Sequence, residues 1–185
     1  NANDRILSLQ ENDLGLFGEL DFNMDSTLDG LIVGDVNFDG NINIQDVLIV
    51  VGIILNNIES NDFQMYAADV NGDTIIDILD IIAMLNIILN NRQIHDLLIE
   101  AKLTLDNKFV HIHTVGEVAG IQLFVKGDFK ITKNFLPNNW AFHYSDDIIL
   151  IYNQSGNSTM PNKLFEFEGN LEIISNTITG WDFKR

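Results

Sequence analysis

Aspartate and asparagine recur along two stretches of this chain at a spacing that suits a hard metal ion. The run DVNFD at 35–39 returns 34 residues later as DVNGD at 69–73, and IILNN at 53–57 returns unchanged at 87–91. A repeat of this fidelity indicates duplication of one structural unit. The two copies are therefore expected to fold in the same way and to do the same chemistry.

Each copy has the ligand spacing of a calcium-binding loop. Calcium takes roughly six to eight oxygen ligands, and a loop of about 12 residues supplies them from positions 1, 3, 5, 7, 9 and 12. Position 7 contributes its backbone carbonyl, so an apolar side chain is harmless there. We therefore predict two bound Ca²⁺ ions. The predicted ligands are Asp35, Asn37, Asp39, Asn41, Asn43 and Asp46 in loop one, and Asp69, Asn71, Asp73, Ile75, Asp77 and Asp80 in loop two.

Position 6 of such a loop makes a sharp turn that favours glycine. Loop one has Gly40 at this position, whereas loop two has Thr74. A β-branched residue at positive φ is strained, so loop two is predicted to be distorted or weaker, with Gly72 absorbing part of the turn. The alternative interpretation is an Asx-rich turn that caps a helix without metal. Six ligand positions repeated at one spacing favour the metal interpretation.

The duplicated loop, followed each time by a helix and carrying Asp at position 12, resembles the type I dockerin module. The run GDVNFDG at 34–40 is close to the family's opening GDVNGDG, and the resemblance spans 33–91. It implies two F-hand-like calcium motifs, antiparallel about a pseudo-twofold axis, and a cohesin-like domain as partner. Loop positions 10 and 11 select the partner in that family. Here they hold Ile44-Gln45 and Ile78-Leu79 rather than small hydroxyl pairs, so partner specificity does not carry over.

Helices are predicted directly after each loop, over 46–56 and 78–90. Both are apolar on nearly every side, while packing two helices against each other buries only one stripe of each. The remaining apolar faces need a second surface, either in this chain or in a partner. The module is therefore not expected to stand alone.

The pattern changes after Arg92 from helical to alternating. Short strand candidates separated by Asn, Gly and Asp turns predict an antiparallel β-sandwich, cohesin-like or immunoglobulin-like. Within it, 118–124 faintly resembles the strand by which cohesin-like domains enter their sheet. The strand candidates are 98–105, 109–114, 120–126, 140–144, 148–152, 164–167, 171–174 and 178–183.

The first 33 residues carry strand-like runs at 6–9, 14–22 and 31–33. An extended apolar arm must pair its backbone, either with the chain's own sandwich or with the sheet of a neighbouring copy. The predicted fold class is α+β. Its three parts are an extended N-terminal strand arm (1–33), a dockerin-like pair of calcium loop-helix motifs (34–92) and an antiparallel β-sandwich (93–185).

Composition restricts the partners and the location. With 27 acidic and 10 basic residues, the formal net charge of −17 repels nucleic acid and anionic lipid. The apolar run 47–55 is too short to span a bilayer, so no membrane insertion is expected. The absence of cysteine excludes disulfides and thiolate metal sites. The chain begins with Asn1 rather than Met, which suggests a processed or truncated N-terminus, and the protein is expected to be exported, extracellular or at the cell surface.

No catalytic constellation is evident, and the protein is not predicted to be an enzyme. His111 and His113 lie on one face of a predicted strand. No third ligand accompanies them, so a solvated strand face is favoured over a transition-metal site. Asn153 and Asn157 fit the glycan acceptor pattern.

Two functions fit these features. The first is an extracellular, calcium-stabilised structural protein that assembles with other copies of itself into a fibre or filament, through dockerin-like and β-strand contacts. The alternative is the docking module of a larger secreted enzyme or scaffold that binds a separate cohesin-like receptor. A carbohydrate-binding or hydrolytic sandwich ranks third, with Trp140 and Trp181 as candidate stacking residues.

Overall fold

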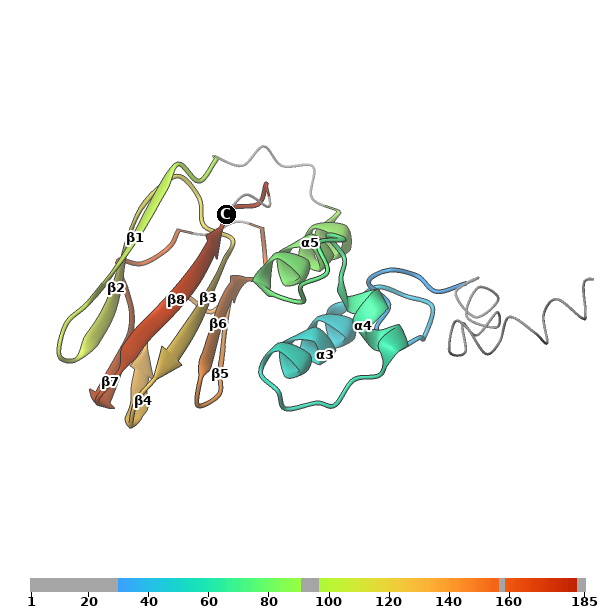
Figure 1. Cartoon of the computed structure of the whole chain (residues 1–185). Helices are drawn as coiled ribbons and strands as arrows, with labels where there is room; N and C mark the ends of the chain where they lie inside the picture. Colours follow the sequence, from blue (N-terminus) through green and yellow to red (C-terminus); the bar gives the residue numbers. More distant parts are fainter. Residues whose placement is uncertain (1–29, 91–96, 157–158, 183–185) are drawn as a thin grey trace, which may run out of the picture. The chain divides into compact units, whose positions relative to one another are not determined.

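The computed structural model describes residues 30–90, 97–156 and 159–182 (Figure 1). The chain divides into two compact units, Asn1–Ile32 and Val33–Arg185, and every helix and strand described below belongs to the second. The predicted strand runs at 6–9 and 14–22 lie outside the described residues. The prediction of a strand at 31–33 is wrong, because the backbone there leads into a turn.

Three helices form the first half of the second unit: α3 (Ile44–Ile54), α4 (Asp62–Ala68) and α5 (Ile78–Leu89). Helix α3 begins two residues before the predicted start, because its N-cap is Asn43, inside the calcium loop. Helix α4 was not predicted. It starts with a capping box between Asn61 and Gln64, whose side chains satisfy two of the backbone N–H groups at the helix start.

Helices α3 and α5 pack against each other through one apolar stripe each. The stripe follows the spacing of three and four residues that places side chains on one face of a helix. The buried side chains of this stripe are Val47, Val50, Val51 and Ile54 on α3, with Ile81, Met84 and Leu85 on α5.

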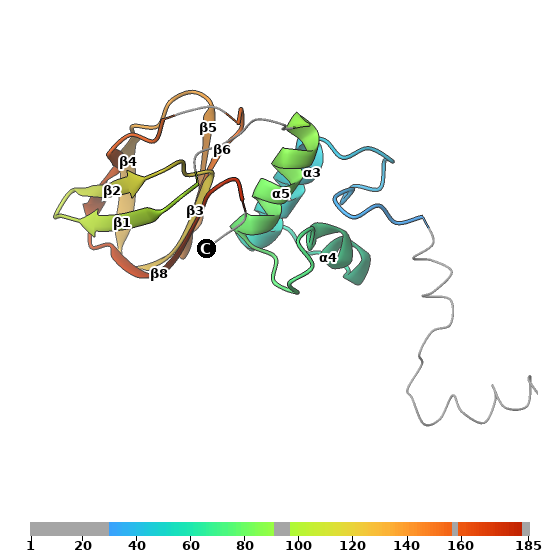
Figure 2. The same ribbon diagram turned by 90° about the horizontal axis from the view of Figure 1, so that it is seen from above.

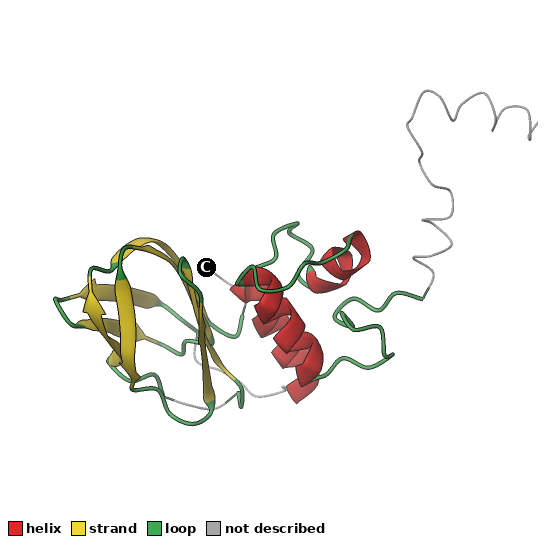
Figure 3. Cartoon of the chain, turned by 90° about the horizontal axis from the view of Figure 1, so that it is seen from below, coloured by secondary structure: helices red, strands yellow, loops and turns green. Residues whose placement is uncertain are grey.

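The second half is a sandwich of two antiparallel four-stranded sheets, as predicted (Figure 3). One sheet has the order β1-β2-β7-β4 and the other β5-β6-β3-β8. The strands are β1 (Glu100–Leu105), β2 (Phe109–Val115), β3 (Gly120–Lys126), β4 (Phe129–Asn134), β5 (Trp140–Tyr144), β6 (Ile148–Asn153), β7 (Lys163–Gly169) and β8 (Glu172–Thr179).

Two strand predictions need correction. Strand β4 was missed, although its inward residues Phe129 and Ile131 alternate with Lys130 and Thr132 in the period-2 pattern. The candidates 171–174 and 178–183 overlap one continuous strand, β8, which ends at Thr179 and pairs with β3 across a register shift at Phe124/Val125, so the predicted strand at 180–182 is wrong.

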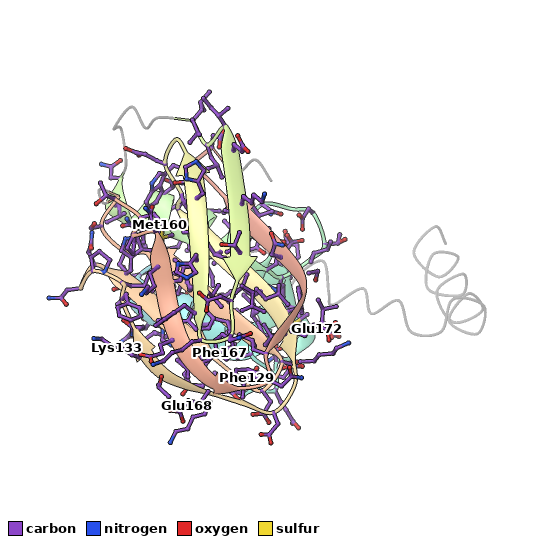
Figure 4. The ribbon with its side chains drawn as sticks, turned by 90° about the vertical axis from the view of Figure 1, so that its left-hand side faces the viewer. Phe129, Lys133, Met160, Phe167, Glu168 and Glu172 are labelled. Atoms are coloured by element: carbon purple, nitrogen blue, oxygen red, sulfur yellow. The ribbon has the colours of Figure 1, made fainter. Side chains whose placement is uncertain are left out.

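The core of the sandwich lies between the two sheets. Figure 4 faces the left-hand side of Figure 1 and shows Phe129 and Phe167 from neighbouring strands close together, with Lys133 and Glu168 nearer the rim. Both tryptophans, Trp140 and Trp181, are buried, so neither is available to stack on a sugar.

Strand β6 is buried on both faces, which explains its uninterrupted apolar sequence. Ile149 and Ile151 face the sandwich core, whereas Leu150 and Tyr152 face a second core shared with the helices. Helix α5 supplies the cover, and Figure 2 shows it between α3 and the sheet β5-β6-β3-β8. The second surface that the predicted helices required is therefore, for α5, the chain's own sandwich.

Candidate calcium-binding loops

The carboxylate at loop position 1 organises the turn that follows it. In loop one, Asp35 Oδ1 accepts a hydrogen bond from the N–H of Asp39 at 3.1 Å and Oδ2 accepts from Gly40 at 2.8 Å. Asp69 does the same in loop two at 3.1 and 2.9 Å, and its Oδ1 also accepts from Gly72 at 2.9 Å. Each aspartate thus holds its loop in a tight curve.

Positions 3 and 5 continue the curve as successive Asx turns. Asn37 Oδ1 accepts from the N–H of Asp39 at 2.8 Å, and Asp39 Oδ1 accepts from Asn41 at 2.9 Å. In loop two, Asn71 and Asp73 make the equivalent bonds at 2.8 and 2.9 Å. The two loops therefore share their local geometry as well as their sequence.

Position 12 joins the end of each loop back to its beginning. Asp46 Oδ1 accepts from the N–H groups of Val36 at 2.9 Å and Asn37 at 3.0 Å, while its Oδ2 accepts from Asn43 at 2.9 Å. Asp80 accepts the three equivalent bonds at 2.9, 3.1 and 2.9 Å. Position 12 thus ties the end of each loop to the two residues that follow position 1.

The residue at position 9 is also the N-cap of the following helix. Asn43 Oδ1 accepts from the N–H of Gln45 at 2.8 Å, and Asp77 Oδ1 accepts from Leu79 at 2.8 Å. Together with the aspartates at position 12, these residues form capping boxes on α3 and α5. The same oxygen-bearing side chains thus belong to the loop and start the helix.

Two positions in each loop have left-handed backbone conformation. In loop one these are Phe38 at φ 62° and Gly40 at φ 88°; in loop two they are Gly72 at φ 74° and Thr74 at φ 69°. The positive φ predicted for Thr74 is confirmed. The predicted distortion of loop two is wrong, since each loop places one glycine at one of the two positions and keeps the same hydrogen bonds.

The loops concentrate buried negative charge in a segment that contains no basic residue. Asp35, Asp46, Asp77 and Asp80 are buried, and no Lys, Arg or His occurs anywhere in 33–90. Burying ionised carboxylates costs free energy unless a countercharge accompanies them. The atoms available as metal ligands are carboxylate, amide and carbonyl oxygens, the ligand set that Ca²⁺ prefers. The residues present therefore fit a calcium ion, and this gap in basic residues is a signal that the ligand spacing alone does not give.

The pKa values of two loop carboxylates differ in opposite directions. Burial raises the pKa of Asp80 from its ordinary value of 3.8 to about 6, with the nearby charges of Asp69 and Asp77 acting in the same direction. Hydrogen bonds from Asn37 and from the Asn41 backbone lower the pKa of the exposed Asp39. A bound cation would stabilise the ionised form of Asp80.

The predicted ligands do not form a purely acidic cluster. In the part of the chain that the structure describes, no three His, Cys, Asp or Glu side chains gather closely enough to hold a metal ion by themselves. The carboxylates are spread around the curve of each loop, with amide and carbonyl oxygens between them. Any metal ion in these loops would therefore depend on the mixed oxygen set, not on carboxylates alone.

The remaining candidate residues lie in the sandwich. His111 Nε2 contacts Asp106 Oδ2 at 3.0 Å, and hydrogen bonds from Lys108 and Phe109 are the main cause that lowers the pKa of Asp106. Asn153 is fully buried, and its Oδ1 accepts from the N–H of Ser155 at 2.8 Å, so the predicted glycan cannot be attached there in the folded protein. Asn157 lies outside the described residues.

Within the described residues, no helix is both long and apolar enough to cross a membrane.

Comparison with known proteins agrees with the loop geometry. Residues 33–89 match the family model of the dockerin type I domain. Neither the curated proteins nor the solved structures include a match to the chain. The segment that closes two equivalent loops and starts α3 and α5 is therefore dockerin-like, and it is followed in this chain by a β-sandwich.

Proposed function

We propose that this chain is an extracellular interaction protein whose calcium-loaded dockerin module, 33–89, docks onto a cohesin-like partner. The observation that carries the proposal is the hydrogen-bond pattern, which repeats at the predicted ligand positions of both loops. We assign the ions to the two predicted ligand sets, one ion per loop. The role is binding, with no catalytic step.

Calcium acts in this proposal through the folding of the loops. It would neutralise Asp46 and Asp80, which are buried at the starts of α3 and α5. Because the same side chains cap those helices, metal binding stabilises the helices that present the docking surface. Binding of a ligand to the folded state alone increases stability by mass action.

The test is binding of the full chain to a panel of immobilised type I cohesin domains, in calcium and in excess EDTA. Binding of at least one domain in calcium, with a loss of 100-fold or more in EDTA, is expected. The double variant Asp35→Ala, Asp69→Ala should bind weakly in both buffers. Equal binding in calcium and EDTA, or no binding to any domain, would overturn the proposal.

A second candidate is self-assembly of copies of this chain into a filament. It is favoured by a groove between two edge strands, β1 and β8, at which Ile99 is 77% exposed. An edge strand with unpaired backbone groups accepts an added strand, and we assign that role to the run 14–22 of a second copy. The groove is lined by Leu98, Ile99, Glu100, Ala101, Asn176, Thr177 and Ile178.

Light scattering tests this second candidate. A self-assembling chain gives large particles in calcium that fall toward the monomer mass of 20.9 kDa in EDTA. A monomer in both buffers at high protein concentration would exclude it and leave the docking module as the function.

A further inference from the structure

The two halves of the dockerin module are used differently, although their sequences are duplicated. On α5, the ridge formed by Ile78, Ile82 and Asn86 faces the sandwich of the same chain. A Cβ atom at Gly120 of β3 would lie 2.7 Å from Ile78 Cγ1 and 3.1 Å from Ile82 Cδ1. Asn86 Nδ2 donates to the backbone carbonyl of Trp181 at 3.3 Å. This contact leaves no room for a partner on that ridge.

A polar contact fixes the start of α5 on the same sheet. The buried side chain of Gln122, on β3, accepts a hydrogen bond from the N–H of Ile78 at 3.0 Å through its Oε1. The first N–H groups of a helix have no partner within the helix. The sheet thus supplies a small residue, Gly120, for the ridge to approach and an amide, Gln122, for the helix start.

The equivalent ridge on α3 has no such cover among the described residues. The residues of α3 that lie 34 positions before those of the α5 ridge are Ile44, Leu48 and Gly52. Ile44 is 42% exposed and Leu48 is 48% exposed, whereas Ile78 and Ile82 are fully buried. The side chain of Ile58 lies against Gly52 and is itself exposed, so it prolongs the apolar surface at that end.

We infer that this α3 ridge (Ile44, Leu48 and Ile58 over Gly52) is the face through which the module docks, and that α5 is excluded from docking by the chain's own sandwich. The inference rests on the proposed function, since it names the surface that the cohesin-like partner contacts. The occupant is argued from the interface already present: a duplicated ridge fits the same kind of surface as its copy. That surface is the open sheet face of a β-sandwich.

The in-chain interface also specifies the chemistry of the partner's face. It needs a glycine or alanine opposite the ridge and an uncharged amide that accepts from the N–H of Ile44, as Gln122 accepts from that of Ile78. Around it, Lys or Arg at the rim would complement a module that has no basic residue. A second copy does not offer this face, because its own α5 already covers its sheet β5-β6-β3-β8.

The chain contains no cysteine, so single cysteines report the accessibility of one position each. Three variants of the full chain are compared in calcium: Leu48→Cys on the α3 ridge, Ile82→Cys on the α5 ridge, and Ile87→Cys as the control. The control position is matched, since Ile87 lies on α5 away from the ridge and has the same 48% exposure as Leu48. The rate of maleimide labelling is measured alone and with a saturating cohesin domain from the panel.

We expect Leu48→Cys and Ile87→Cys to react at least 50-fold faster than Ile82→Cys in the free protein. The cohesin domain should slow labelling of Leu48→Cys at least 10-fold and leave Ile87→Cys within twofold. Rapid labelling of Ile82→Cys would contradict the occlusion of α5. Bound cohesin that leaves Leu48→Cys reactive would overturn the α3 ridge while sparing the proposed function.

A second pair of variants keeps the test independent of cysteine at a buried site. Leu48→Lys should weaken cohesin binding at least 10-fold, and Ile87→Lys by less than twofold, because both changes are at exposed helical positions and only the first lies on the ridge. Equal losses in the two variants would contradict the assignment. If no cohesin domain in the panel binds the unmodified chain, the proposed function and this inference are overturned together.

Discussion

At the residue scale, the two loops differ most at position 6. Thr74 has φ 69° in loop two, where loop one has Gly40 at φ 88°. A non-glycine residue in the left-handed region lowers stability by about 1–3 kcal/mol. Glycine at that position removes this strain, but the larger conformational entropy that glycine loses on folding offsets part of the gain. Each loop has one non-glycine residue in the left-handed region, Thr74 at position 6 of loop two and Phe38 at position 4 of loop one.

We predict that Thr74→Gly raises the free energy of unfolding by about 1 kcal/mol and strengthens calcium binding to loop two several-fold. Urea denaturation and calcium titration measure the two effects. The neighbouring Ile75→Gly is the control, because Ile75 has no positive φ and glycine relieves no backbone strain there. A destabilised Thr74→Gly variant would show that the threonine side chain contributes more than its strain costs.

Asp80 makes the metal-free protein sensitive to pH. Burial is the main cause that raises its folded-state pKa from 3.8 to about 6, so the folded chain holds this proton more tightly than the unfolded chain. The contribution of Asp80 to stability is therefore fully present below about pH 4 and is lost as pH rises to about 6, an effect of about 1–2 kcal/mol after solvent screening. In calcium the trend reverses, because the ion needs the ionised carboxylate.

Urea denaturation in EDTA at pH 4.5 and pH 7 tests this prediction. The contribution of Asp80 appears as a fall in unfolding free energy between the two values, and the fall should disappear in Asp80→Asn. If both proteins have the same pH slope, Asp80 does not carry the raised pKa.

At the scale of elements, the contact between α5 and β3 depends on one buried amide. Gln122 satisfies the N–H of Ile78, which would otherwise be buried without a partner. We predict that Gln122→Leu lowers the free energy of unfolding by about 1–3 kcal/mol, the usual cost of an unsatisfied buried donor. Chemical denaturation measures it, with the exposed Gln154→Leu as the control, which should differ from the wild type by less than about 0.5 kcal/mol.

Most of the helices and strands could be predicted from the sequence. The period of 34 residues and the Asx spacing locate both loops and both helices, because loop and helix share Asn43 and Asp77 as caps. Most strands follow from alternation. Helix α4 has no counterpart in the repeat pattern, and β8 was divided because its middle residues, 175–177, are all polar.

The cover over α5 was not predictable from local patterns. Ile78 and Ile82 are apolar in the same way as Ile44 and Leu48, yet only the first pair is buried. The difference comes from the fold, which places Gly120 opposite α5. Local sequence shows that a face is apolar, while the topology decides whether the chain itself covers it.

At the scale of the whole molecule, one hydrophobic cluster joins the dockerin module to the sandwich. It combines Val47, Ile82 and Met84 of the helices with Leu150 and Tyr152 of β6. Because loss of calcium would loosen the start of α5, it should weaken this shared core as well as the loops. Metal binding is therefore expected to stabilise both halves together.

Removal of calcium is predicted to lower the melting temperature by at least 10 °C and to increase hydrogen exchange in α5 and in β6. The expected loss of protection from exchange in β6 distinguishes this account from one in which the loops unfold alone. The strands of the other sheet, such as β2, act as the internal control and should change less. Unchanged exchange in β6 would mean that the sandwich does not depend on the metal.

The central claim is that the repeated loops hold one calcium ion each, and calorimetric titration of the metal-stripped full chain tests it most directly. The account predicts two ions per chain, falling to one in Asp35→Ala and one in Asp69→Ala. Absence of calcium binding at neutral pH, or binding unchanged by both substitutions, would contradict the account and leave the loops as Asx turns that cap two helices.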